Sequence, residues 1–243
     1  MAAEVFRNSY MTELNLEKTE DGSRFTRAAV PVYLEYEEPP LQMVEILRYS
    51  GVPIDAAKRI LADPSTEEEK SLLEKVEKVI ALSKGQIQYK VGYLSGVLEW
   101  DEEGFPMLPV SQKSENLKKN LRNCEGFVMF AATIGSGIDR LIRRFEVSDP
   151  SMGVIFQGYG AERAESLCNL FCEEVRVAAE EKGYKLHPRF SPGFGDLPIT
   201  VQKEFLDRLD ASRRLGITLG ESCLMSPSKS VTAFIGLERI TER

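Results

Sequence analysis

The feature that most constrains the fold is the longest apolar run of the chain, Phe127 to Ile134, which contains one threonine. The run is far shorter than the roughly 20 residues that a transmembrane helix needs. A short apolar run bounded by glycines, here Gly126 and Gly135, is typical of a strand that is buried on both faces of a sheet. The sequence therefore predicts a central strand at this place and no membrane-spanning segment.

Helical patterns flank this strand on both sides. Ser65 and Glu68 form the S-x-x-E pattern of a capping box, and the apolar residues behind it repeat at helical spacing up to about Ser83. Gly183 and Gly216 are placed to end two later helices. The predicted helices cover residues 41–49, 53–62, 65–83, 114–123, 138–145, 150–182 and 200–215.

Strand patterns are fewer. Residues 86–98 alternate apolar and polar side chains, and their Ser95-Gly96 pair is a candidate hairpin turn. Residues 30–34 contain Pro31, which is tolerated in an edge strand. The run SVTAFIGL at residues 230–237 predicts a final strand. Helices and strands therefore alternate along the chain.

The composition is that of an ordinary globular protein, with 42% hydrophobic and 28% charged residues. Its 243 residues are enough for one large domain or two small ones. The sequence shows no internal repeat, low-complexity tract or Pro/Ser-rich linker. The weakest joint lies near residues 83–85, so we predict a mainly helical region over residues 1–84 and a mixed region over residues 85–243, packed together as a single unit.

Charge and cysteine content exclude several classes of protein. The 31 basic residues face 38 acidic ones, and the net charge of −7 argues against a nucleic-acid partner. The four cysteines lack the density of a disulfide scaffold and the spacing of a structural zinc site, so we expect free thiols. Residues 1–20 show neither a signal-peptide nor a transit-peptide pattern. We therefore expect a cytoplasmic protein.

A single histidine, His187, restricts the possible chemistry. A Ser-His-Asp or Cys-His triad, or a site with several histidine ligands, would have to be built on that one imidazole. Cys168 and Cys172 lie four residues apart on one face of the predicted long helix, but two thiolates alone make a poor zinc site, and packing explains them better. We predict neither a catalytic residue nor a bound metal ion.

Two segments are candidates for ligand binding. Gly135-Ser136-Gly137 opens a helix after a strand, but it completes neither G-x-G-x-x-G nor a P-loop, which favours a simple strand-to-helix turn over a phosphate site. Residues 189–195 form either a rigid loop or a backbone cradle in which Arg189 binds a carboxylate. Glu165 borders the apolar stripe of the long helix, and periodicity alone favours a solvated side chain.

The second of these segments carries a resemblance to a known family. Its motifs follow one another in this order: Arg189-x-x-x-Gly193-Phe194, Glu221-Ser222, Met225-x-Pro227 and Ser230-Val231. With ATIGSGIDRLIRR and the Ala164-Glu165 helix upstream, this pattern resembles the C-terminal activation domain of cobalamin-dependent methionine synthase. The resemblance covers roughly residues 125–236 and is greatest to the free-standing version of that domain.

The resemblance implies a fold and a ligand. The fold is α+β, with a twisted, mainly antiparallel sheet flanked by helices and a helical part at the N-terminus, and the ligand is S-adenosylmethionine. In the family, the motif arginine and the nearby backbone hold the methionyl part of the ligand, and a glutamate of the preceding long helix lines the site. The implied site residues are Glu165, Arg189, Ser191, Gly193 and Phe194, the last standing where full-length enzymes often have tyrosine.

The resemblance also implies a role as an activation subunit for a cobalamin-dependent methionine synthase, which would not methylate homocysteine by itself. The cobalamin motif D-x-H-x-x-G is absent, so cobalamin is expected on a partner chain, with flavodoxin or another reductant as a further partner.

Two alternatives stay open. The chain ends soon after Gly236, where full-length enzymes carry further ligand-contacting tyrosines, so the first alternative is an adaptor that docks on a corrinoid protein without binding S-adenosylmethionine. The second, an unrelated small-molecule methyltransferase, would need the glycine-rich loop that residues 135–140 do not complete.

Overall fold

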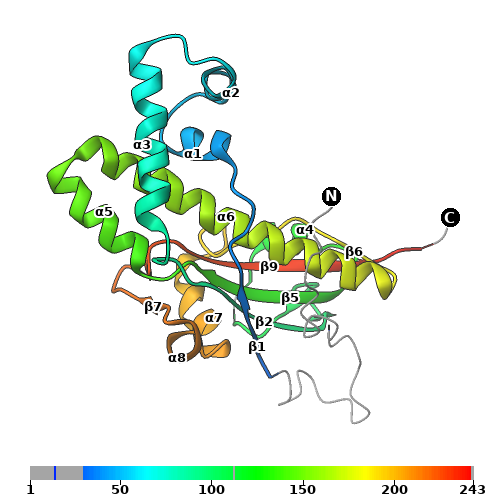
Figure 1. The fold of residues 1–243 in the computed structure, drawn as a ribbon. Coiled ribbons are helices and arrows are strands. Elements are labelled where there is room, and N and C mark those ends of the chain that lie inside the picture. The colour runs from blue at the N-terminus through cyan, green and yellow to red at the C-terminus, as the bar shows by residue number, and fades with distance from the viewer. Residues whose placement is uncertain (1–13, 15–29, 112, 242–243) are drawn as a thin grey trace.

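The computed structural model describes residues 14, 30–111 and 113–241, and its centre is a five-stranded antiparallel sheet (Figure 1). The strands in spatial order are β1 (Val32–Tyr36), β2 (Tyr89–Val97), β5 (Cys124–Thr133), β9 (Ser230–Arg239) and β6 (Tyr184–Leu186). Every neighbouring pair is antiparallel. The predicted α+β class, with an antiparallel sheet flanked by helices, is therefore confirmed, and so is the central position of the apolar run.

Each face of the sheet is covered by its own set of helices, because successive side chains of a strand point to opposite faces. The first face packs against α1 (Met43–Tyr49), α3 (Glu67–Ser83), α5 (Gly137–Ser148) and the long helix α6 (Pro150–Glu181). The second face packs against α4 (Glu115–Asn120), η1 (Ile199–Val201), α7 (Gln202–Arg208) and α8 (Ala211–Leu215). In Figure 1, α6 runs along one side of the sheet, while α7 and α8 lie on the other.

The long helix α6 supplies most of the first core. Its predicted apolar stripe, from Ala164 through Phe171 to Ala178, is buried throughout. The ring of Phe171 lies 4.8 Å from that of Phe130 on β5 and 5.4 Å from that of Tyr93 on β2, measured between centroids. Helix α6 is thereby fixed against the middle strands.

Helix α3 begins one residue later than the sequence pattern indicates. The capping residue is Thr66, whose hydroxyl accepts from the backbone N–H of Glu69 at 3.2 Å, while the Glu69 carboxylate turns back to the N–H of Thr66. The predicted pair Ser65 and Glu68 is therefore wrong by one position. Ser65 also donates to Glu69, so the carboxylate serves both residues. The predicted helix end at Ser83 is confirmed.

Two further expectations are corrected. Ser95-Gly96 does not form a turn, because β2 continues through both residues, which pair with Val128 and Phe127 of β5. The helix expected over residues 200–215 is divided into η1, α7 and α8, since Asp210 adopts a left-handed conformation at φ +44°. Short elements not predicted by sequence are β3 (Glu99–Trp100), β4 (Pro106–Met107), β6, β7 (Thr218–Leu219) and β8 (Met225–Ser226).

The predicted edge strand near residue 32 is confirmed as β1, which pairs with β2 along its whole length. Helix α2 (Ile54–Ala62) completes the helical segment between these two strands. None of the helices in the described ranges combines the length and apolarity that crossing a bilayer requires. Apart from Leu14, the N-terminal residues on which the targeting prediction rests lie outside the described part. The division near residue 84 stays a prediction.

Candidate functional site

The segment that holds Arg189 is fixed to the edge of the sheet. Beyond β6 the chain continues beside β9, where the backbone N–H of His187 donates to the carbonyl of Gly236 at 2.9 Å. Phe190 and Phe234 then exchange two backbone hydrogen bonds of 2.9 and 2.8 Å. These bonds hold the backbone of Arg189, so that its side chain reaches the facing surface of α6.

The guanidinium of Arg189 forms an ion pair with Glu165 on α6. Its Nη2 lies 2.8 Å from Oε2 of Glu165 and 3.4 Å from Oδ1 of Asn169. The exposed fractions of the two charged side chains are 28% for Arg189 and 37% for Glu165. The structure thus brings together two of the predicted site residues, which are 24 positions apart, and Glu165 is not simply solvated.

The surroundings keep this arginine charged and the neighbouring thiols neutral. Burial lowers the pKa of Arg189, but the hydrogen bond to Glu165 raises it, and the net shift is upward. Burial raises the pKa of Cys168 strongly and that of Cys172 to about 11. Within the described ranges no group of three His, Cys, Asp or Glu residues is placed to hold a metal ion. The Cys168 side chain is fully buried in the core between α6 and the sheet.

Ser191, Gly193 and Phe194 form a tight turn directly after this ion pair. Gly193 has φ +93°, a conformation that residues with a side chain rarely adopt. Its N–H donates to the carbonyl of Leu197 at 2.9 Å, and the N–H of Phe194 donates to that of Ser191 at 3.2 Å. These two donors are used within the turn, which contributes shape rather than free N–H groups. The residue Phe194 is 66% exposed.

Asp196, which the sequence analysis did not single out, anchors the turn to α4. Its carboxylate accepts from the Ser114 hydroxyl and from the backbone N–H groups of Glu115 at 2.7 Å and Asn116 at 3.1 Å. The hydrogen bond from Ser114, together with those backbone N–H groups, lowers the pKa of Asp196 to about 2. A serine at a helix start is a visible signal in the sequence, but its partner 82 residues away is not.

The glycine-rich segment 135–137 makes the strand-to-helix turn that its pattern favours. A Cβ atom on Gly137 would lie 1.9 Å from the backbone oxygen of Gln86, so this glycine allows α5 to pass close to the chain that enters β2. The N–H of Gly135 donates to Oγ1 of Thr133 at 3.1 Å. Close packing explains Gly137, and a positive φ of +74° explains Gly135.

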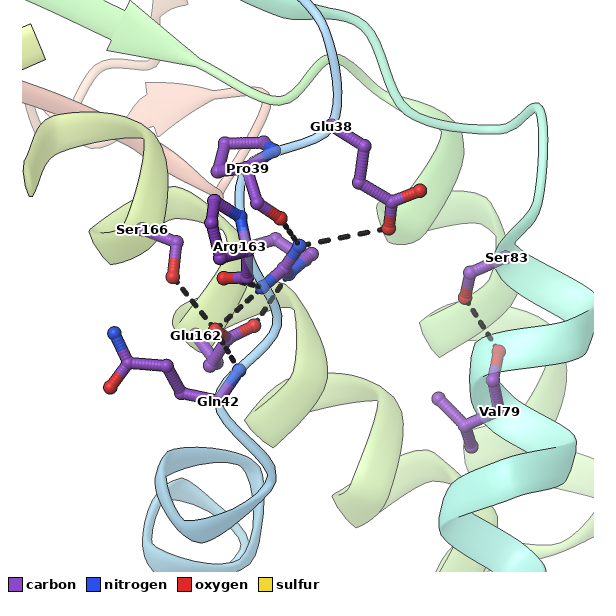
Figure 2. Close-up of polar contacts among 9 residues, drawn as sticks. Glu38, Pro39, Gln42, Val79, Ser83, Glu162, Arg163 and Ser166 are labelled. Carbon is purple, nitrogen blue, oxygen red and sulfur yellow. Dashed lines mark hydrogen bonds and ion pairs between the residues drawn. The ribbon is translucent and has the colours of Figure 1, made fainter. Parts of the chain in front are cut away.

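A second polar cluster, also not predicted, lies deep beside α6 (Figure 2). Glu162 and Arg163 are only 1% and 0% exposed, and they form an ion pair of 2.5 Å. The carboxylate of Glu162 also accepts from the Ser166 hydroxyl at 2.7 Å and from the N–H of Gln42 at 3.0 Å. The guanidinium is thus held on the face of the helix that is turned away from solvent.

The same guanidinium is hydrogen-bonded to the connection between β1 and α1. Arg163 donates to the backbone oxygens of Pro39 at 2.7 Å and Pro40 at 3.0 Å, and its Nη1 lies 3.6 Å from the carboxylate of Glu38. A buried charge of this kind is tolerated only when it is paired and hydrogen-bonded. Arg163 lies four residues after the buried Tyr159, so both side chains are on one side of α6.

Comparison with known proteins gives a structural likeness. No protein-family model matches the chain, and no curated protein matches it. Among solved structures, it is similar to the crystal structure of the MetH reactivation domain bound to AdoHcy, with a TM-score of 0.59 and 14% sequence identity. The match covers 97% of this chain and 87% of that one. At this identity, the likeness shows a shared fold.

Proposed function

We propose that the chain is an S-adenosylmethionine-binding activation subunit for a cobalamin-dependent methionine synthase. The observation that carries the proposal is the ion pair between Arg189 and Glu165, which lies beside the Gly193 turn and has an Nη2–Oε2 distance of 2.8 Å. Support comes from the fold, which is shared with a MetH reactivation domain that binds AdoHcy. The motif order after Arg189 points the same way.

The chemistry of the pair suits the aminoacyl part of this ligand. S-adenosylmethionine carries a carboxylate, which a planar guanidinium binds with two donors, and ammonium and sulfonium cations, which a carboxylate stabilises. A partly exposed ion pair contributes only about 0–1 kcal/mol to stability, so exchange of its partners for ligand groups costs little. Arg189 then orients the ligand carboxylate, while Glu165 neutralises its positive charges.

The work of the chain in this scheme is placement. When bound, S-adenosylmethionine would supply its sulfonium methyl group as a methyl cation, with S-adenosylhomocysteine as the leaving group, and a reductant such as flavodoxin would supply the one electron that reduces cob(II)alamin on the partner chain to the cob(I)alamin that accepts the methyl group. Cobalamin belongs to the partner chain, so the residues here only bind and orient the methyl donor. This role needs no catalytic histidine. We place it in the cytoplasm, where the four free thiols, Cys124, Cys168, Cys172 and Cys223, would stay reduced.

Calorimetric titration with S-adenosylmethionine and S-adenosylhomocysteine tests the proposal. We expect a dissociation constant of about 1 μM or lower, and a loss of about tenfold or more, equivalent to about 1.4 kcal/mol, for Arg189→Ala. Glu165→Gln keeps the size of the side chain and should weaken binding in the same direction. Arg176→Ala is the matched control, because Arg176 lies on α6, as Glu165 does, and pairs with Glu173 and Glu180 rather than with Glu165.

A different result would favour the adaptor. If neither ligand binds at millimolar concentration, with the chain alone or with the cobalamin-carrying partner present, the proposed site is wrong. A chain that still associates with the partner under those conditions would act by docking on it. Binding that is equally strong in Arg189→Ala would place the ligand elsewhere on the molecule.

A further inference from the structure

His187, the only histidine of the chain, bridges two other elements with both of its ring nitrogens. Nδ1 lies 2.6 Å from the backbone oxygen of Asn120, at the end of α4. Nε2 lies 2.7 Å from Oε2 of Glu238, on β9. The side chains of His187 and Glu238 are both largely buried. The imidazole therefore connects the end of β6 to a helix and to a neighbouring strand.

Both partners of this imidazole are acceptors, so no single neutral tautomer can donate to both of them. A backbone oxygen and a carboxylate only accept hydrogen bonds, and an imidazole donates from both nitrogens only when both carry a proton. The hydrogen bonds from His187 and Lys185 lower the pKa of Glu238, which is therefore ionised near neutral pH. A neutral imidazole would turn one lone pair toward an acceptor and lose that bond.

The imidazole lies directly before the segment from Arg189 to Phe194, here called the Arg189 turn. His187 precedes Arg189 by two residues, and its backbone N–H is bonded to Gly236. The side chain of Asn120 donates to the backbone oxygen of Pro188 at 3.1 Å. Asn120, at the end of α4, is therefore hydrogen-bonded to both His187 and Pro188. If the imidazole releases α4 or β9, the backbone of Arg189 loses a support that the ion pair with α6 needs.

We propose that doubly protonated His187 is a positioning residue for the Arg189 turn, so that ligand binding weakens as this imidazole loses its proton. The ligand part of this inference rests on the proposed function, whereas the link between protonation and the order of the turn does not.

The other titratable groups around the imidazole do not account for the proposed pH dependence. Lys185 on β6 places its Nζ 3.1 Å from Oε2 of Glu238 and adds a positive charge on the far side of the carboxylate. Burial, with a smaller effect of Glu238, raises the pKa of the Cys124 thiol on β5 to about 12, so this thiol stays neutral. An imidazole is the side chain that ordinarily changes charge between about pH 5 and 8.

Nuclear magnetic resonance can follow this residue directly, because one histidine gives one set of imidazole signals. We would record its ring nitrogen shifts from about pH 5.5 to about pH 8.5, a range that brackets an ordinary imidazole. Over the same range we would measure S-adenosylhomocysteine binding and the hydrogen-exchange protection factor of the Phe190 amide, which is bonded to Phe234. The affinity for S-adenosylhomocysteine and the Phe190 protection factor are each expected to fall by about tenfold as the pH rises and the imidazole loses its proton. This is the size of effect expected for the loss of one charge-assisted hydrogen bond.

Three variants separate positioning from mere stability. His187→Gln removes the titrating group, so its ligand affinity and Phe190 protection should not vary with pH. Glu238→Gln supplies an amide that can donate to the neutral imidazole, so the high-pH loss should disappear while the turn stays ordered. Lys185→Gln is the matched control, since it removes the other cation beside Glu238, and the pH dependence should remain.

Several outcomes would overturn the inference. One is an imidazole that stays neutral over the whole range, and another is a wild-type pH profile that matches that of His187→Gln. If no ligand binds at any pH, the proposed function fails, but the Phe190 protection factors still decide the positioning role. A protection factor that is unchanged while the imidazole titrates would contradict it.

Discussion

At the scale of single residues, the buried pair of Glu162 and Arg163 offers a direct test of stability. Glu162→Gln keeps the shape but leaves the Arg163 guanidinium buried without its counter-charge, and we expect a loss of about 3–5 kcal/mol in the free energy of unfolding. Urea denaturation measures it. The control is Glu38→Gln, because the Glu38 side chain is 61% exposed and its replacement should cost less than about 1 kcal/mol. Equal losses in both variants would contradict this view of the cluster.

Individual site residues were predictable only in part. Periodicity placed Glu165 at the border of the apolar stripe, but it could not decide whether this side chain faces solvent or a partner 24 residues away. The connection between Glu165 and Arg189 came from the motif resemblance. The backbone partners of Glu162 and Arg163, at Gln42, Pro39 and Pro40, lie more than 100 residues earlier in the chain. No local pattern encodes such contacts, because they arise only when α6 packs against the segment before α1.

At the scale of elements, the start of α3 gives a quantitative test. Thr66→Ala removes the hydroxyl that accepts from the N–H of Glu69, and a lost N-cap costs about 1 kcal/mol of stability. Thr66→Ser retains the hydroxyl and should lose only a small part of this. The midpoints of urea unfolding compare the two variants. If serine and alanine are equally destabilising, the hydroxyl does not cap the helix.

Elements with a long regular pattern were predicted well, and those decided by tertiary contacts were not. The apolar spacing of α3 and α6 fixed both helices to within a few residues. Ser95-Gly96 has turn-forming residues, yet pairing with β5 keeps it in a strand. The helix breaks at Asp210 because its backbone is left-handed. Aspartate tolerates this conformation, but the presence of an aspartate does not predict it. Tertiary packing overrides local preference at both places.

At the scale of the whole molecule, the order of strands lies beyond periodicity. The two edge strands, β1 and β6, come from residues near 34 and 185, and β9, from the end of the chain, is inserted between β5 and β6. Hydrophobic patterns identify strands but not their neighbours. The antiparallel sheet could be predicted only through the resemblance, which carries topology that the residues alone do not reveal.

Acid sensitivity is a property of the whole molecule that follows from its anchored carboxylates. Hydrogen bonds from Ser114 and backbone N–H groups lower the pKa of Asp196 to about 2, and those from Arg59 and Ser65 lower the pKa of Glu69 to about 2. Since the unfolded chain binds these protons more readily, the stabilisation is present above about pH 4 and is lost as the pH falls toward about 2. Burial raises the pKa of Glu174, which acts in the opposite direction.

Thermal unfolding from about pH 6 down to about pH 2 measures this effect, and Asp196→Asn isolates one contribution to it. The variant should melt below the wild type near neutral pH, because an amide is a weaker acceptor for the N–H groups of Glu115 and Asn116. The difference in melting temperature between the variant and the wild type should disappear at low pH, where Asp196 becomes protonated in the wild type. Asp207→Asn, on an exposed position of α7, should follow the wild type throughout. A gap for Asp196→Asn that stays constant with pH would mean that the carboxylate charge does not hold the turn to α4.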